Sequence, residues 1–495
     1  MNTGMLIEMA ADGMGERVAV GSRPGGLTYA GLFDQARRVA SVVAECGAGR
    51  VVSVAQNSAL LPALVFGSGL AGVPFVPVNY RLADEQLCAI LARTAPAVAV
   101  VDEDAVGRVS GVDGLTVLSP TALRARVEAA APAEAGFVDP EEIAVLLYTS
   151  GTTGEPKAAV LRHRHLASYV ISTVEFMGAG DDHAALVSVP PYHVAGMATI
   201  LTSVYGGRRL VYLPQFDPQR WVDVARDEGI THAMVVPTML GRILDVLEAR
   251  GEKLPSLLHL AYGGGRMPTP VLERALARLP AVGFVNAYGL TETASTIATL
   301  GPDDHRAAFE SADPAIRARL GSVGRPLPSL EVEIRDPDGA ALAAGERGEI
   351  FVRGEQVSGE YLGRSALTAD GWFPTNDGGR LDDAGFLFVE GRLDDVIVRG
   401  AENLSPGEIE DTLITHPAVA EAGVVGIPDE EWGETVAAAV VLEPGAEVTV
   451  EELQRWVRDR LRSSRTPTLI RFRPELPYNE TGKLLRRVLR TDLAR

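Results

Sequence analysis

The sequence predicts an α/β protein that divides into at least two domains. Through most of the chain, short runs rich in β-branched residues alternate with helical patterns, and these runs are apolar on both faces. Such runs are typical of parallel strands that helices cover on both sides. The chain has 495 residues, too many for one ordinary hydrophobic core. From about residue 324 the strands instead alternate apolar and polar residues, which indicates antiparallel strands with one solvated face.

The expected elements follow in chain order. In the first part, helices such as 58–70 separate buried strands, which we expect at 51–55, 98–101, 185–189, 210–213 and 232–236. Beyond residue 324, alternating strands at 330–334 and 348–352 flank an Asp-Pro-Asp-Gly turn. The residues after 391 are expected to form a compact α+β unit. Its helices should begin near Ser405 and Thr449, with a strand at 437–442 between them.

Composition and charge narrow the functional classes. The formal net charge of −19 argues against a nucleic-acid-binding surface, which requires a basic face. The two cysteines, Cys46 and Cys88, are interpreted as reduced, partly buried thiols, because two such distant cysteines form no zinc framework. Residues 1–17 carry acidic side chains and no long apolar run, so neither a signal peptide nor a membrane span is predicted. We therefore expect a cytoplasmic protein.

A polar loop after a predicted strand is the strongest local signal. The string Thr-Ser-Gly-Thr-Thr-Gly-Glu-Pro-Lys begins at Thr149 and ends at Lys157. Its glycines allow backbone N–H groups to turn toward a polyphosphate, its hydroxyls add donors, and its lysine adds positive charge. The pattern differs from the GxxxxGK[ST] loop of nucleotide kinases. It therefore predicts a phosphate-binding loop of a different kind.

Several further segments share their order and spacing with one protein family. They are 77–82 (PVNYRL), 190–196 (PPYHVAG), 286–293 (NAYGLTET), 371–377 (GWFPTND), 391–395 (GRLDD), 406–410 (PGEIE) and 479–486 (NETGKLLR). Together with the phosphate loop, this series resembles the adenylate-forming, or AMP-binding, superfamily, and in particular its stand-alone acyl-CoA synthetases. The resemblance covers nearly the whole chain.

The resemblance implies a division into two domains. Residues 1–391 are expected to form a large N-terminal adenylation domain, with two layered α/β subdomains and a small distorted β-barrel near 324–390. Residues 392–495 are expected to form a small, mobile α+β lid. Enzymes of this family rotate the lid between an adenylating pose and a thioester-forming pose, and Asp394 resembles the hinge residue.

The resemblance also implies roles in the binding of ATP and Mg²⁺. Thr291 is expected to donate to the α-phosphate, and Glu292 to ligate Mg²⁺, which a carboxylate oxygen suits. Asp377 and Arg392 are expected to hold the ribose, and Lys483 to stabilise the charge that develops in the transition state. The other nucleotide-binding candidates are Thr149, Ser150, Gly151, Thr152, Thr153, Gly154, Lys157, Gly264, Gly265, Asn286, Ala287, Tyr288 and Gly289. For the glycines at 263–265, a flexible turn is the alternative.

The acyl site is expected to be mainly apolar. A histidine beside an apolar run is more often a core residue, but the resemblance makes His193 a catalytic, pocket-lining gate. The candidate residues include no acidic group to pair with an amine, which argues against an α-amino acid. Their mainly apolar character predicts a hydrophobic, aromatic or polycyclic acid. Arg266 is expected to pair with a second carboxylate or to face solvent. The acyl-pocket candidates are His193, Val194, Met197, Met239, Gly264, Arg266 and Asn286, and those of the CoA tunnel are Gly400, Ala401 and Glu402.

Three positions depart from the usual pattern of the family. Asn376 replaces the glycine of the usual Thr-Gly-Asp. Asparagine tolerates a left-handed backbone, so the turn before Asp377 is expected to survive. Ala401 replaces a glycine beside the thiol tunnel, so it is expected to narrow the tunnel or to cost free energy if φ is positive. Gly407 replaces the usual alanine, which weakens the first turn of a helix by under about 1 kcal/mol.

The sequence as a whole predicts a stand-alone acid:CoA ligase that uses ATP and Mg²⁺ and forms an acyl-adenylate. ATP, coenzyme A and a small carboxylic acid are the expected partners; dimerisation is common among such enzymes, and the sequence does not decide it. One alternative is an enzyme that loads a carrier protein, or that performs a single half-reaction, for example thioester formation from a supplied acyl-adenylate. Another is a non-catalytic nucleotide sensor, against which the retention of Lys483, Glu292 and Asp377 argues.

Overall fold

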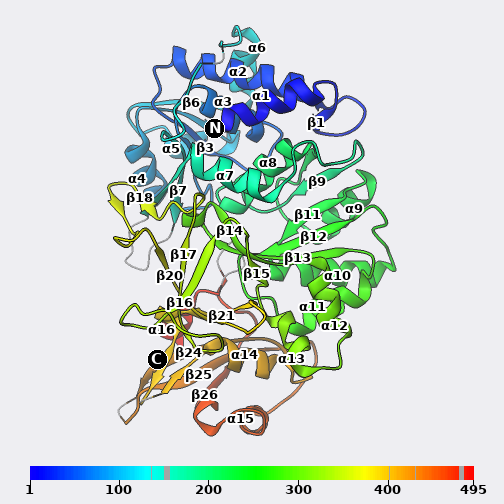
Figure 1. Ribbon diagram of the computed structural model, residues 1–495, viewed down its shortest axis with the longest axis vertical. Coiled ribbons are helices and arrows are strands. Elements are labelled where there is room, and N and C mark those ends of the chain that lie inside the picture. Colours follow the sequence, from blue (N-terminus) through cyan, green and yellow to red (C-terminus); the bar gives the residue numbers. More distant parts are fainter. Residues whose placement is uncertain (135, 150–156, 401, 430, 479–483) are drawn as a thin grey trace.

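The structure is a computed structural model that describes residues 1–134, 136–149, 157–400, 402–429, 431–478 and 484–495. These residues form four β-sheets with helices packed on them (Figure 1). The blue and cyan elements lie at one end of the molecule, the green elements in the middle, and the orange and red elements at the other end. The layered α/β arrangement and the α+β unit at the C-terminal end agree with the predicted fold class.

An eight-stranded sheet lies at the N-terminal end. Its strands are β3 Val51–Val54, β4 Phe75–Pro77, β5 Ala97–Val101, β6 Leu115–Leu118, β7 Ile143–Thr149, β8 Lys157–Arg162, β18 Glu360–Tyr361 and β19 Arg364–Ser365. Their order is β19-β18-β8-β7-β4-β3-β5-β6, and β7, β4, β3, β5 and β6 are parallel to one another. Strands β3 and β5 are buried at every position, which agrees with the apolar runs in the sequence.

A nine-stranded sheet forms the middle of the molecule. Its strands are β1 Val18–Val20, β2 Leu27–Thr28, β9 Ala184–Val187, β10 Arg209–Tyr212, β11 His232–Val235, β12 His259–Gly263, β13 Gly283–Leu290, β14 Ser295–Leu300 and β15 Arg325–Pro326. Their order is β15-β14-β13-β12-β11-β9-β10-β1-β2. Strands β10, β9, β11, β12 and β13 are parallel, so their carboxyl ends lie along one edge of the sheet.

Helices fill the space between these two sheets and cover their outer faces. One hydrophobic cluster joins strand residues of both sheets to α1 Thr3–Met14, α2 Tyr29–Glu45, α3 Leu61–Leu70, α6 Pro120–Ala129, α7 His163–Thr173 and α8 Val194–Gly206. Helices α4 Asp84–Thr94 and α5 Val106–Val109 pack on the outer face of the eight-stranded sheet. A separate cluster packs α9 Pro218–Asp227, α10 Pro237–Arg250, α11 Thr269–Arg278 and α12 Pro302–Glu310 on the nine-stranded sheet; α13 Pro314–Arg317 follows α12.

A four-stranded antiparallel sheet occupies the segment for which a distorted barrel is expected. Its strands are β16 Glu331–Arg335, β17 Gly348–Arg353, β20 Phe373–Leu381 and β21 Leu387–Arg392, in the order β16-β17-β20-β21. The first two correspond closely to the predicted alternating strands. Strand β21 ends at the connection to the C-terminal part of the chain, so this sheet lies next to the predicted hinge.

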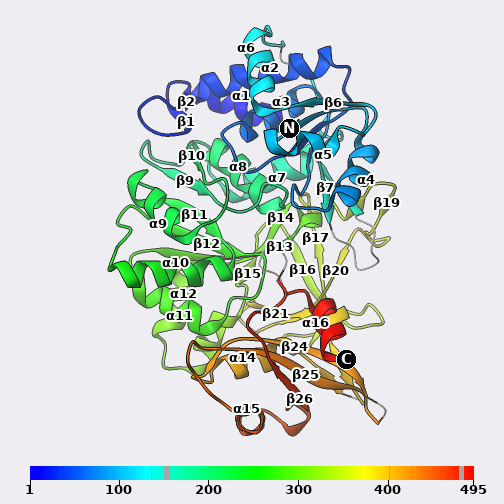
Figure 2. The same cartoon turned by 180° about the vertical axis from the view of Figure 1, so that it is seen from behind.

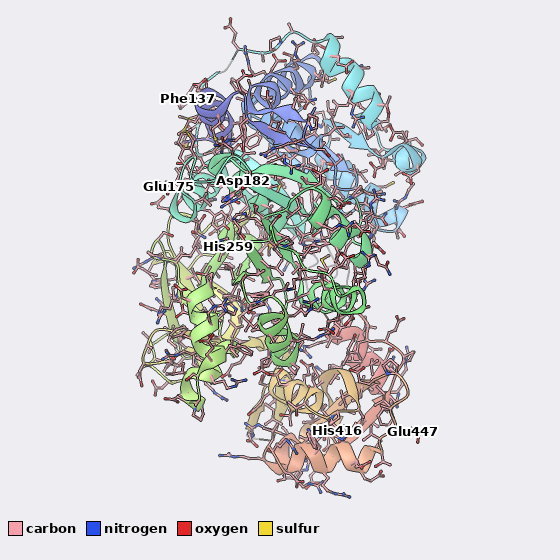
Figure 3. The ribbon with its side chains drawn as sticks, turned by 90° about the vertical axis from the view of Figure 1, so that its right-hand side faces the viewer. Phe137, Glu175, Asp182, His259, His416 and Glu447 are labelled. Atoms are coloured by element: carbon pink, nitrogen blue, oxygen red, sulfur yellow. The ribbon has the colours of Figure 1, made fainter. Side chains whose placement is uncertain are left out.

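The elements after residue 396 form the C-terminal unit, a five-stranded sheet with three helices. Its strands are β22 Ile397–Arg399, β23 Glu402–Leu404, β24 Val419–Asp429, β25 Gly433–Leu442 and β26 Leu469–Phe472; its helices are α14 Pro406–Ile414, α15 Val450–Arg458 and α16 Arg486–Leu493. Figure 2 shows α16 beside β24, and Figure 3 shows His416 and Glu447 of this unit at the opposite end from Phe137. A capping box between Thr449 and Glu452 begins α15, where a helix is predicted.

Short 3₁₀ helices connect several of these elements. They are η1 Glu103–Ala105, η2 Thr291–Thr293, η3 Ala318–Gly321, η4 Leu393–Asp395 and η5 Ser463–Arg465. Two of them, η2 and η4, contain predicted site residues. None of the helices in the described ranges is both long enough and apolar enough to span a bilayer.

Candidate active site

A cavity of about 380 Å³ lies between the C-terminal unit and the two large α/β layers. Pro190, Phe216 and Met239 contribute apolar surface to its wall, and Ser188 and Thr238 contribute hydroxyls. On the other side, the C-terminal unit closes the cavity with Glu421, Glu475, Leu476 and Tyr478. The cavity is therefore bounded by residues from both ends of the chain.

The position of this cavity follows from the parallel sheet. Ser188 comes directly after β9, Pro214 follows β10, and Val236 comes directly after β11, and all three line the cavity. In open α/β sheets, ligands bind outside the carboxyl ends of the parallel strands. The fold thus places the cavity where a small molecule is expected to bind.

His193 is connected to the cavity through a row of aromatic rings. Its ring lies 4.9 Å from that of Tyr192, which in turn packs edge-on against Tyr80, 5.8 Å away, in the cavity wall. His193 occupies the N-cap position of α8. Burial lowers the pKa of His193 to about 4, so the imidazole is neutral at physiological pH.

The other acyl-pocket candidates occupy different environments. Met239 lines the cavity, whereas Met197 is 1% exposed and lies in the core between the two sheets, with Val194 packed against the same core. Gly264 has a φ of +77°, and a β-carbon there would lie 3.6 Å from Val236 of the cavity wall. Gly264 therefore lies beside the cavity wall, and its left-handed backbone also fits the alternative of a flexible turn.

Three of the nucleotide-binding candidates, which lie on β13, β20 and β21, meet one another. The Tyr288 hydroxyl donates to Asp377 Oδ2 at 2.7 Å, and Arg392 Nη1 lies 3.4 Å from Asp377 Oδ1. Arg392 also donates to the Thr375 carbonyl at 2.9 Å. Asp377 is only 5% exposed, so these contacts fix the orientation of a buried carboxylate. Such a carboxylate can accept hydrogen bonds from a diol.

Glycines in β12 and β13 allow the backbones of neighbouring strands to approach closely. A β-carbon on Gly289 would lie 1.7 Å from the Ser295 carbonyl oxygen, and one on Gly263 would lie 2.4 Å from the Ala287 carbonyl oxygen. Only glycine avoids both collisions. Neighbouring Asn286 donates to the Ser322 carbonyl at 3.3 Å, which fixes the edge of β13 beside these glycines.

The turn that contains Thr291 and Glu292 is held by a distant segment. The Tyr361 hydroxyl donates to Glu292 Oε1 at 2.5 Å. The Glu292 carbonyl accepts hydrogen bonds from the backbone N–H groups of Ser358 at 2.8 Å and Gly359 at 3.0 Å. Buried Gln356 donates to the carbonyl oxygens of Thr293 and Thr296 at 3.0 and 2.8 Å. The turn is thus fixed in both its side chain and its backbone.

The carboxylate of Glu292 fits a role in binding Mg²⁺. Within the described ranges, no group of three or more His, Cys, Asp or Glu side chains could hold a metal ion. Mg²⁺ is often bound by one or two carboxylates together with substrate phosphates and water, so a single carboxylate suffices. These residues therefore fit a Mg²⁺ ion that arrives with a nucleotide.

Several predicted residues lie outside the described part of the chain. They are Lys483, Ser150, Gly151, Thr152, Thr153, Gly154 and Ala401. The described neighbours of the phosphate loop are β7 and β8, which are antiparallel and pair Thr149 with Lys157. On either side of Lys483, Tyr478 and Leu484 form an isolated bridge, and Tyr478 lines the cavity.

The predicted hinge lies in η4, which makes two side-chain contacts with other parts of the structure. Asn376 has a φ of +59°, which agrees with the expectation that asparagine accepts a left-handed turn. Its side chain donates to Asp394 Oδ2 at 2.7 Å. The next residue, Asp395, lies 3.5 Å from Arg486, which is also paired with Glu410. Arg486 thus has two acidic partners.

Arg266 pairs with a residue of the C-terminal unit. Its guanidinium donates to Asp411 of α14, and its side chain is 44% exposed. Burial raises the pKa of Asp411 to about 6, although Arg266 lowers it. A β-carbon on Gly407 would lie 2.0 Å from Arg266 Nη1, so the glycine leaves space for this guanidinium.

Two candidates for the predicted CoA tunnel lie in the described part of the chain. The Gly400 N–H donates to the Trp432 carbonyl at 2.8 Å, and Glu402 lies 3.2 Å from Arg465.

Sequence reasoning did not identify Tyr361 or Gln356, nor the acidic partners of Arg486. Their partners lie 69, 63 and 76 residues away in the chain, so no local pattern marks them. Only the fold brings these side chains to the predicted site.

Comparison with known proteins agrees with this geometry. Residues 7–362 match the AMP-binding enzyme family, and residues 408–483 match the AMP-binding enzyme C-terminal domain. The chain belongs to the AMP-binding enzymes. It is an enzyme of the family that includes AMP-forming acid–CoA ligases.

Individual relatives cover most of this enzyme. It is 38% identical over 369 residues to a 2-succinylbenzoate–CoA ligase of Bacillus cereus (strain Q1), covering 72% of this chain and 73% of the relative. It is 33% identical over 487 residues to the fatty acid–[acyl-carrier-protein] ligase ScoC of Streptomyces coeruleorubidus, covering 94% and 91%. The o-succinylbenzoate CoA synthetase MenE of Bacillus subtilis, solved with ATP and a magnesium ion, has a TM-score of 0.84, 29% identity and 99% coverage of both chains.

Proposed function

We propose that this enzyme activates a hydrophobic, aromatic or polycyclic carboxylic acid with ATP and transfers the acyl group to coenzyme A. In the first step, a carboxylate oxygen attacks the α-phosphorus, the bond to the β-phosphate oxygen breaks, and pyrophosphate leaves. In the second step, the thiol sulfur attacks the acyl carbon, the bond to AMP breaks, and the thiol proton passes to solvent. The products are acyl-CoA and AMP.

The observation that carries this proposal is the short path between the cavity and the buried Asp377 carboxylate. Val236 lines the cavity, and Gly264 adjoins it. Gly263 pairs with Ala287 of β13, and the next residue, Tyr288, donates to Asp377. An acid in the cavity and a ribose on Asp377 would therefore lie on the two sides of one strand end, as transfer to an α-phosphate requires.

The residue roles in this proposal combine geometry with resemblance. Asp377 and Arg392 would hold the ribose, Thr291 would donate to the α-phosphate, and Lys483 would stabilise negative charge on the reacting oxygens. Glu292 would hold Mg²⁺, which supplies charge neutralisation at the phosphates when bound. The 150–154 loop would bind the remaining phosphates, and Asp394 would act as the hinge between residues 1–391 and 392–495.

The relatives support the class of acid and leave two acceptors to test. One relative is a ligase of 2-succinylbenzoate, an aromatic acid, and another is a ligase of fatty acids, which are hydrophobic. Pro190, Phe216 and Met239 form an apolar part of the wall that suits both, and Arg81, Arg242, Glu421 and Glu475 add charged groups around it. The second relative transfers to an acyl-carrier protein, so a carrier protein is the alternative acceptor to coenzyme A.

The decisive test is a substrate panel analysed by mass spectrometry. The enzyme is incubated with ATP, Mg²⁺ and aliphatic, aromatic or polycyclic acids, with either CoA or a phosphopantetheinylated acyl-carrier protein. We expect AMP, pyrophosphate and acyl-CoA with at least one acid. If the carrier protein becomes acylated and no acyl-CoA forms, the carrier protein would replace CoA as the acceptor. Parallel reactions with synthetic acyl-adenylates and CoA, without ATP, would show whether only the second step is retained. Absence of product in every reaction would contradict the proposal.

A further inference from the structure

We infer that Arg266 and Asn376 are positioning residues that hold the C-terminal unit over the cavity during the first half-reaction. The inference rests on the proposed two-step function. The C-terminal unit contributes Glu421, Glu475 and two other residues to the cavity wall, so it closes the site in this pose. The resemblance implies that the C-terminal unit turns between the two steps, and in this pose Tyr478, which precedes Lys483 in the chain, lies in the cavity wall, as the first step requires. Contacts that hold it therefore affect the two steps differently.

The first contact joins the edge of the cavity to the C-terminal unit. Arg266 lies two residues after Gly264, which adjoins the cavity wall, and its guanidinium pairs with Asp411 on α14. The pair is partly exposed, with side-chain exposures of 44% for Arg266 and 34% for Asp411. A pair of this kind is weak enough to break within a catalytic cycle.

Gly407 leaves room for this contact in its present geometry. It lies on the same helix as Asp411, four residues earlier, so both face the incoming guanidinium. Any side chain at position 407 would begin with a β-carbon 2.0 Å from Arg266 Nη1. The glycine weakens the helix, but it provides the space in which the arginine reaches across from the large layers.

The second contact lies at the chain connection itself. Asn376, on β20, donates its side-chain amide to Asp394 at 2.7 Å, and its own N–H donates to Glu349 at 2.9 Å. The carboxylate of Asp394 is therefore tied to the four-stranded sheet. Rotation of the backbone at Asp394 must break this bond. A glycine at 376 would keep the left-handed turn but remove the bond.

The test separates the two half-reactions in full-length variants. Acid-dependent pyrophosphate release without CoA measures the first step, with the most active acid of the substrate panel. Acyl-CoA formation from the synthetic adenylate of that acid measures the second step. We expect Arg266→Ala, Asp411→Asn and Gly407→Ala each to slow the first step about three- to fivefold, with the second step unchanged or faster. Asn376→Gly should act in the same direction.

Two comparisons give the test its specificity. Gly407→Ala should have no further effect in an Arg266→Ala background, because both changes act on the same contact. Arg274→Ala is the matched control, since Arg274 forms ion pairs with Asp245 and Glu248 within the large layers and has a similar exposure. It should change neither step. Equal slowing of both steps by the Arg266 and Asn376 variants, or no change in either, would overturn the inference.

Hydrogen-exchange mass spectrometry of the substrate-free enzyme provides a readout that is independent of the reaction. Peptides that cover residues 392–399 and α14 should exchange faster in Arg266→Ala and Asn376→Gly than in the wild type or in Arg274→Ala. Faster exchange in an enzyme that makes no product from any acid would contradict the proposed function but retain the positioning role. Unchanged exchange in an active enzyme would contradict the positioning role alone.

Discussion

At the scale of single residues, the orientation of Asp377 depends on one hydroxyl group. Asp377 is 5% exposed, and Tyr288 donates to one of its oxygens at 2.7 Å. Burial, followed by the adjacent Asp377 carboxylate, raises the pKa of Tyr288 well above its ordinary value, so the hydroxyl remains a donor. A carboxylate held in this way is oriented before a ligand binds, which reduces the cost of ordering it.

We expect Tyr288→Phe to raise the KM for ATP about fivefold, because the loss of one hydrogen bond costs on the order of 1 kcal/mol. Pyrophosphate release at varied ATP concentration measures this effect. Tyr262→Phe is the matched control. Tyr262 lies on β12, the strand next to β13, and its hydroxyl bonds to His305 of α12 at 2.8 Å rather than to Asp377. Both variants should lose stability, but only Tyr288→Phe should change the KM. An equal KM in the two variants would show that Tyr288 does not orient the ribose ligand.

At the scale of elements, the turn between β13 and β14 is stable because the segment 356–359 holds it. The Thr293 hydroxyl bonds within the turn, and Gln356, Ser358 and Gly359 supply further donors to carbonyl groups in and beside it. Gln356 is 1% exposed, so its amide replaces water that cannot reach these carbonyls. Buried polar groups that lose a partner pay the full desolvation penalty.

Gln356→Ala should therefore destabilise the protein by about 1–3 kcal/mol, because it leaves the carbonyl oxygens of Thr293 and Thr296 without this donor. It should also raise the Mg²⁺ concentration required for half-maximal pyrophosphate release, since Glu292 lies in the same turn. Urea unfolding measures the first effect, and a Mg²⁺ titration measures the second. A stability loss with an unchanged Mg²⁺ requirement would separate the turn from metal binding.

At the scale of the whole molecule, buried neutral histidines link stability to pH. His163, His165 and His305 are 0–1% exposed, and burial is the main cause that lowers their pKa values, to about 4, 3 and 4. An unfolded chain binds protons at these groups below about pH 6.5. Because the folded pKa values are depressed, the stabilising contribution is fully present above pH 6.5 and is lost as the pH falls toward 4.

We expect the free energy of unfolding to fall between pH 6.5 and pH 5, by roughly 1.4 kcal/mol per pH unit for each fully buried histidine. Urea unfolding at several pH values measures this slope. His305→Gln removes one such group, so its slope should be smaller by about one proton. A slope that is unchanged in this variant would show that His305 is not neutral in the folded protein at pH 5.

Local sequence patterns determined the strands, the capped helices and the nucleotide motifs of this protein. Alternating or two-sided apolar runs and capping residues act over a few neighbouring positions. The strand at 51–55 and the helix that begins near Thr449 could therefore be predicted without tertiary contacts. The same holds for the left-handed turn at Asn376, because αL tolerance is a property of the residue itself.

The tertiary structure alone decided which distant side chains meet. Arg266 pairs with Asp411 across 145 residues, and Tyr361 reaches Glu292 across 69, so no sequence window contains either pair. The departure at Gly407, which the sequence presents only as a weaker helix, becomes the space for the Arg266 guanidinium once α14 packs against the large layers. Such contacts depend on how the chain is packed, and packing positions are set by the whole hydrophobic core rather than by neighbouring residues.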